Sequence, residues 1–141
     1  MTASVPEKRW RRVAIFGLAY FGLGVSSALI SNPLQSELGQ ASIRVGIFLV
    51  GIAVYVSHIR IELAGLPGRP RAAALLVALG VASGTFLLAV YAVSMALWET
   101  SRVGTALLAA LVIWPVATGI PAFLVALLAG AIRARARSRG S

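Results

Sequence analysis

The stretch AAALLVALGVASGTFLLAVYAVSMAL, residues 72–97, contains no charged side chain. The hydrocarbon core of a bilayer is about 30 Å thick, and a helix that rises about 1.5 Å per residue needs roughly 20 apolar residues to cross it. This stretch has more residues than that length requires. It therefore predicts a transmembrane helix and decides the class of fold to which the chain belongs.

Three further apolar stretches reach or approach the same length, at residues 13–30, 43–64 and 103–132. The first ends before Pro33, and the second ends at Gly65 and Pro67, which are residue types that commonly stop helices. The sequence predicts an all-α integral membrane protein of one domain, residues 1–141. We expect a four-transmembrane-helix bundle with basic cytoplasmic tails at residues 1–12 and 133–141. A cleaved signal peptide in place of the first helix is the alternative, and it leaves the other three unchanged.

The composition agrees with a membrane protein and excludes several kinds of chemistry. Hydrophobic residues make up 59% of the chain and charged residues 12%, whereas about a quarter of the residues in a soluble protein are charged. The chain has no cysteine, which excludes disulfides, thiol nucleophiles and thiolate metal ligands. We expect no metal and no cofactor, since a single histidine with one nearby acid falls short of the three or four ligands that a metal site needs.

Positive charges are concentrated on one side of the predicted membrane. Lysine and arginine in short loops favour the cytoplasmic side. Arg44 and Arg102 fall on the opposite side, and every other basic residue lies in the tails or around the connection between the second and third helices. We therefore expect both termini to be cytoplasmic. The excess of arginine over lysine, together with many alanines and glycines, indicates a GC-rich bacterial genome and hence the inner (cytoplasmic) membrane.

Small residues on the first and third predicted helices indicate where these helices pack. Lipid tails are as apolar as leucine, so membrane helices associate where small side chains let their backbones approach. Gly17 and Gly24 lie on the first helix, and Gly80 and Gly84 form a GxxxG motif in the third. We predict that these glycines pack helices within the chain, with a homodimer contact as the alternative. A weak similarity between residues 23–27 and 79–83 leaves open whether the two hairpins arose by duplication.

The fourth predicted helix contains the segment WPVATGIP, residues 114–121. Each proline removes one backbone N–H and leaves the carbonyl four residues earlier without its helical donor. We therefore expect the helix to bend or partly unwind at a candidate break formed by Pro115, Thr118, Gly119 and Pro121. One interpretation is a plain kink, repaired by the Thr118 hydroxyl or by a neighbouring helix. The other is a broken transport helix whose free carbonyls coordinate a cation or face a substrate.

Polar side chains on the second predicted helix follow one face. Steps of three and four residues from Arg44 reach Tyr55, His58 and Glu62, whereas Arg60 lies on the other side. Polar residues within membrane helices usually face the bundle or water, so we expect this candidate functional face to point inward. The spacing of four residues predicts a hydrogen bond between His58 and Glu62. Such a pair is either part of a proton-coupled path or an ordinary helix end.

Two clusters of basic residues are expected to contact anionic lipid headgroups, where each charge contributes about 1 kcal/mol. They are Lys8, Arg9, Arg11, Arg12, Arg133, Arg135, Arg137 and Arg139. We expect membrane lipids, including these anionic headgroups, as partners. Nucleic acid is not expected as a partner, because the tails offer no stacking surface beyond Trp10.

The sequence assigns no catalytic residue, and we expect a protein that is not an enzyme. Few ionisable groups lie inside the predicted helices, small-residue seams are present, and no soluble domain is predicted. These features favour an accessory or scaffolding subunit, bound to other membrane subunits or to itself. The alternative is a small homo-oligomeric channel or transporter that uses the polar face of the second helix and the proline break of the fourth. An enzyme would have only His58, Glu62 and Tyr55 to work with.

The charge distribution predicts the orientation of the chain, and reporter fusions can test it. Alkaline phosphatase depends on disulfides that form outside the cytoplasm, so fusions to either terminus are expected to be inactive. A fusion after Ser36, between the first two helices, is expected to be active and serves as the positive control. An active fusion at either terminus would contradict the predicted orientation.

Overall fold

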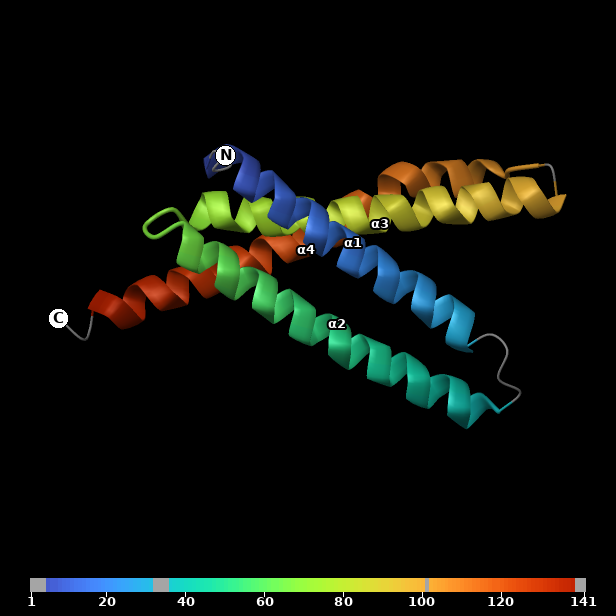
Figure 1. The fold of residues 1–141 in the computed structure, drawn as a ribbon, viewed down its shortest axis with the longest axis horizontal. Helices are drawn as coiled ribbons and strands as arrows, with labels where there is room; N and C mark the ends of the chain where they lie inside the picture. The colour runs from blue at the N-terminus through green and yellow to red at the C-terminus, as the bar shows by residue number, and fades with distance from the viewer. Residues whose placement is uncertain (1–4, 32–35, 101, 139–141) are drawn as a thin grey trace.

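The structure is a computed structural model that describes residues 5–31, 36–100 and 102–138. These residues form four helices and no strand (Figure 1): α1 (Val5–Ser31), α2 (Glu37–Gly65), α3 (Pro70–Thr100) and α4 (Thr105–Ser138). Each helix is long and apolar enough to cross a membrane, so the prediction of four such helices is confirmed. α1 begins before its predicted bound and α4 ends after its own, because the basic turns at residues 5–12 and 133–138 are helical.

Local sequence explains where α2 and α3 begin. The Ser36 hydroxyl accepts a hydrogen bond from the Gly39 amide at 3.3 Å and so caps α2. The turn after α2 contains Gly68, whose φ of 77° is a backbone conformation that favours glycine. Pro70 then opens α3, where its missing amide donor costs little because the first turn of a helix has no partner for that donor.

The helices form two antiparallel hairpins, α1–α2 and α3–α4, that pack together at one end (Figure 1). We call it the terminal end: α1 and α3 begin there, and α2 and α4 end there. α3 is central because it contacts the other three helices, whereas the described parts of α1 and α4 do not contact each other. Away from the terminal end, Figure 1 shows the α1–α2 hairpin diverging from α3 and α4. The bundle is therefore closed at one end and open at the other.

Small side chains on α3 allow close packing at the terminal end. Ala74 and Val77 of α3 are buried together with Ile59 of α2 and Ala126 of α4. Ala73, the neighbour of Ala74, is buried as well. Because an alanine adds only one carbon to the surface of a helix, three helix backbones can approach a common core. This core fixes the position of α2 relative to the α3–α4 hairpin.

The structure places the four glycines proposed for packing, Gly17, Gly24, Gly80 and Gly84, at contacts between helices. A Cβ atom at Gly84 would lie 2.7 Å from the carbonyl oxygen of Gly17, so α1 and α3 touch backbone to backbone. A Cβ atom at Gly24 would lie 2.8 Å from the Leu88 side chain. These contacts use the GxxxG motif of α3 within one chain.

The two prolines of α4 do not interrupt it, because α4 is one helix through both Pro115 and Pro121. The partial unwinding that these prolines suggested is therefore not found. The Thr118 hydroxyl donates to the Trp114 carbonyl at 2.8 Å. It does not reach the Leu111 carbonyl, whose helical donor Pro115 removes, because a threonine hydroxyl reaches back only one turn. Thr118 therefore does not supply the donor that the Leu111 carbonyl lacks.

Replacing Gly84 by alanine is expected to reduce the free energy of unfolding by about 1–3 kcal/mol, the usual cost of overpacking. The new Cβ atom would lie 2.6 Å from the Tyr20 Cβ atom and 2.7 Å from the Gly17 carbonyl oxygen. Gly22→Ala is the control, because nothing lies within 4 Å of a Cβ atom there. Thermal unfolding in detergent measures both variants. Equal stability of the two would contradict the backbone contact between α1 and α3.

Candidate functional site

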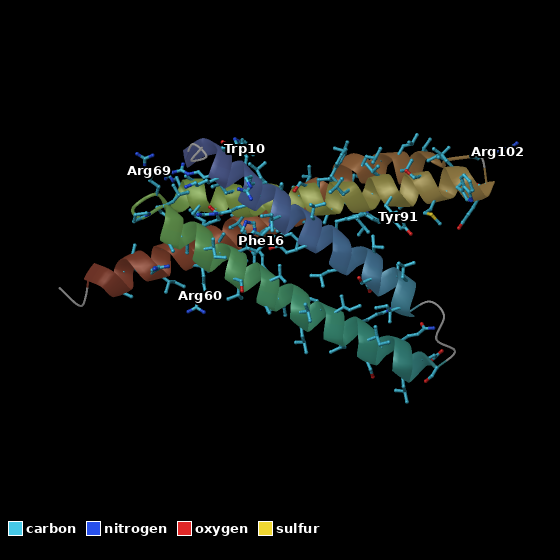
Figure 2. The ribbon with its side chains drawn as sticks, in the orientation of Figure 1. Trp10, Phe16, Arg60, Arg69, Tyr91 and Arg102 are labelled. Atoms are coloured by element: carbon cyan, nitrogen blue, oxygen red, sulfur yellow. The ribbon has the colours of Figure 1, made fainter. Side chains whose placement is uncertain are left out.

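A group of polar and aromatic side chains lies where α1 and α2 meet near the terminal end. Arg12, Phe16 and Tyr20 recur every four residues along α1, and His58 and Glu62 have the same spacing on α2. These two faces meet, since Phe16 contacts His58 and Arg12 pairs with Glu62. We call these five residues the buried polar cluster. Figure 2 shows Phe16 among the packed helices.

His58 joins three helices. Its side chain is 0% exposed, and its ring stacks on Phe16 of α1 with ring centroids 3.8 Å apart and planes inclined by 8°. The Tyr20 hydroxyl shares a hydrogen bond of 3.3 Å with His58 Nδ1. On the other side, a Cβ atom at Gly80 of α3 would lie 2.5 Å from His58 Cε1. The ring therefore occupies space that exists only because residue 80 is a glycine.

Glu62 is a buried carboxyl group with one cation close to it. Its side chain is 1% exposed, and Glu62 Oε1 lies 3.9 Å from Arg12 Nη1. The Arg12 side chain is 40% exposed, so it connects the buried carboxyl group to the surface. Arg9 also interacts electrostatically with Glu62. Burying a carboxylate without a compensating charge is costly, and the two arginines of α1 reduce that cost.

The expected hydrogen bond between His58 and Glu62 is absent from the described residues. His58 Nδ1 instead faces Tyr20, and His58 Nε2 has no hydrogen-bond partner among these residues. Neither carboxyl oxygen of Glu62 has one either. Sequence spacing suggested a pair within α2, but stacking on Phe16 turns the histidine ring toward α1. The two side chains share a face without bonding to each other.

The other residues considered on α2, Tyr55, Arg44 and Arg60, lie in different surroundings in the structure. The Tyr55 hydroxyl donates to the Ala122 carbonyl of α4 at 2.8 Å, which links α2 to α4. Arg44 is exposed near the other end of α2, away from the buried polar cluster. Arg60 projects outward from α2, as Figure 2 shows and as its position on the helix predicted. The inward face of α2 therefore includes Tyr55, His58 and Glu62 but not Arg44.

The residues of the candidate helix break form contacts with α3. The Thr118 hydroxyl shares a hydrogen bond of 2.9 Å with the hydroxyl of Thr85. A Cβ atom at Gly119 would lie 3.3 Å from the Ala82 Cβ atom, so the helices are close at this point. Pro121 lines a pocket on the α2 side. The segment thus contributes to packing in the described structure.

The basic residues proposed as lipid contacts differ in their surroundings. Lys8, Arg11, Arg133 and Arg135 are exposed, whereas Arg9 and Arg12 are half-buried. Arg12 was expected to contact lipid, but it also pairs with Glu62, which lies fifty positions later in the chain. The side chain of Arg137 and all of Arg139 lie outside the described residues.

The contacts of the buried polar cluster join helices and place one carboxyl group beside a guanidinium group. Within the described residues, no three histidine, aspartate or glutamate side chains come together as metal ligands would. The α1 half of the cluster could have been predicted from the sequence, because Arg12, Phe16 and Tyr20 are spaced four residues apart and so share one face of a helix. This spacing was overlooked. Arg12 was predicted only as a lipid contact, and no role was predicted for Phe16 or Tyr20.

Comparisons of the chain with models of protein families, with curated proteins and with solved structures find no match. Only the geometry of the buried polar cluster therefore indicates its role.

The pairing of Arg12 with Glu62 predicts a charge dependence of stability. Arg12→Gln is expected to lower the free energy of unfolding by about 1–3 kcal/mol, between the values for exposed and fully buried pairs, because the Glu62 carboxyl group loses its nearest cation. Adding Glu62→Gln should recover most of that loss. Unfolding in detergent of the single and double variants gives the coupling energy.

Arg11→Gln is the matched control, since Arg11 is exposed and has no contact with Glu62. An equal loss of stability in the Arg11 and Arg12 variants, or additive effects in the double variant, would contradict the pairing.

Proposed function

We propose that this chain is a non-enzymatic integral membrane protein that acts as an accessory or scaffolding subunit. One observation carries the proposal: the polar side chains of α2 are used in packing, while its apolar side chains at the open end have little cover. His58 and Glu62 are buried, and Tyr55 bonds to α4. Leu38, by contrast, is 81% exposed.

The open end of α2 offers a surface for another membrane helix. Leu38, Val45 and Leu49 are large, apolar and exposed, and their spacing of seven and four residues puts them on one face. Figure 1 shows this half of α2 diverging from α3 and α4. In a membrane, such a face contacts either lipid or a partner helix, and partner helices associate by close packing. The partner is another membrane subunit or a second copy of this chain.

The proposal includes a location and an orientation. The arginines and the lysine near the terminal end support cytoplasmic termini in a bacterial inner membrane, by the preference of positive charges for the cytoplasmic side. Exposed members of the two basic clusters then lie where anionic lipid headgroups are found. Figure 2 has Arg69 at the terminal end and Arg102 at the opposite end.

A homo-oligomeric channel or transporter finds less support in the contacts. A conducting path needs polar groups that face water or a substrate. Three of the four candidate groups of α2, His58, Glu62 and Tyr55, face Phe16, Arg12 and the carbonyl of Ala122 instead. The fourth, Arg44, is exposed. The prolines of α4 lie within a continuous helix.

Purification in mild detergent tests the subunit role. We expect the protein to elute with a second polypeptide or as an oligomer, at a mass above that of one 14.7 kDa chain with its detergent. A photo-crosslinking amino acid at Leu49 should form an adduct with that partner. The same amino acid at Leu128, which is exposed on α4, serves as the control. Recovery of the protein only as a lone monomer, with no adduct at Leu49, would count against the proposal.

A further inference from the structure

Two adjoining pockets form a cleft between α2 and α4. The larger, with a volume of about 760 Å³, lies toward the terminal end and includes Arg60 and Arg133 in its lining. The smaller, of about 380 Å³, lies toward the open end and is lined by apolar side chains such as Phe48. Tyr55 and Val125 border both pockets, so the two adjoin along these side chains. Both volumes are within the range of about 300–1,000 Å³ that ligand pockets occupy.

The terminal end of the cleft has positive charge without a matching negative charge. Neither Arg60 nor Arg133 forms an ion pair or hydrogen bond with another described residue. The nearest acidic residue along α2, Glu62, is buried beside Arg12. Two guanidinium groups at one opening favour a phosphate group, because arginine donors match phosphate oxygens well.

The rest of the cleft is apolar and has the length of one lipid leaflet. From Arg60 to Phe48 the axis of α2 rises about 18 Å at 1.5 Å per residue, compared with about 15 Å for half of a bilayer core. Gly51 lies along this wall, and nothing is within 4 Å of a Cβ atom placed on it. The missing side chain leaves space for an acyl chain.

We propose that this cleft binds one anionic phospholipid, with its phosphate between Arg60 and Arg133 and an acyl chain along Gly51. The site rests on the proposal that the helices span a membrane, but it needs no partner subunit. It is distinct from the general attraction of the basic clusters for a charged surface, because it combines two unpaired arginines with an apolar cleft. A free phosphate would use only the charged part, whereas a phospholipid fills both.

Native mass spectrometry of the purified chain, reconstituted in vesicles of phosphatidylcholine and phosphatidylglycerol and then extracted, tests the site. The protein is expected to retain phosphatidylglycerol in preference to phosphatidylcholine. Arg60→Gln and Arg133→Gln should each reduce that preference about fivefold, the effect of one arginine near an anionic headgroup. Gly51→Leu should abolish retention of the lipid by filling the apolar part of the cleft.

Matched controls separate this site from surface charge and from misfolding. Arg69→Gln removes an exposed charge at the terminal end but outside the cleft. Gly46→Leu repeats the glycine-to-leucine substitution elsewhere on α2, at a position where nothing lies within 4 Å of a Cβ atom. Both should retain the lipid as the unaltered chain does, and all variants should keep their helical circular dichroism.

Three results would overturn the site. They are no preference for phosphatidylglycerol in the unaltered chain, equal losses in the Arg60 and Arg69 variants, and displacement of the lipid by inorganic phosphate. Failure to find a partner subunit would leave this measurement unchanged, so the two proposals fail independently.

Discussion

The His58 ring lies between Phe16 of α1 and Gly80 of α3, so a single side chain of α2 contacts both neighbouring helices. A side chain of this size fits only because residue 80 has no Cβ atom. Protein interiors are close-packed, so even a small increase in side-chain volume displaces the neighbouring atoms. The residue at position 80 therefore constrains the distance between α2 and α3. Together with the backbone contact between α1 and α3, the His58 contact holds the two hairpins together at the terminal end. Glu62, one turn further along α2, is consequently carried into the same interior.

The position of α2 has consequences on its other side. Because α2 packs on α1 and α3 through His58, its contact with α4 is slight, with the Tyr55 hydroxyl bonded to the Ala122 carbonyl. The cleft that contains Arg60 and Arg133 results from this separation. The buried polar cluster and the proposed lipid site therefore both depend on the position of α2. Through the cluster α2 packs against α1 and α3, and the lipid site lies in the space between α2 and α4.

Several features could be predicted from sequence because they depend on neighbouring residues. The absence of charge in residues 72–97 and the proline and glycines around residue 67 were enough to predict α3 and its connection to α2. The inward face of α2 followed from spacing alone at Tyr55, His58 and Glu62. Spacing gave no information on the partner atoms, so the expected bond between His58 and Glu62 was wrong, and the pairing of Arg12 with Glu62 was missed.

The sequence by itself determined that the chain forms four apolar helices and where its charges lie. Transfer of a helix out of water depends on its length and composition, which are local properties. Only the tertiary structure decided that α4 stays helical through its prolines, that the hairpins diverge, and that the GxxxG motif of α3 packs within the chain. These features depend on distances between residues far apart in the sequence. The space beside Gly80 is an example, since the ring that fills it comes from another helix.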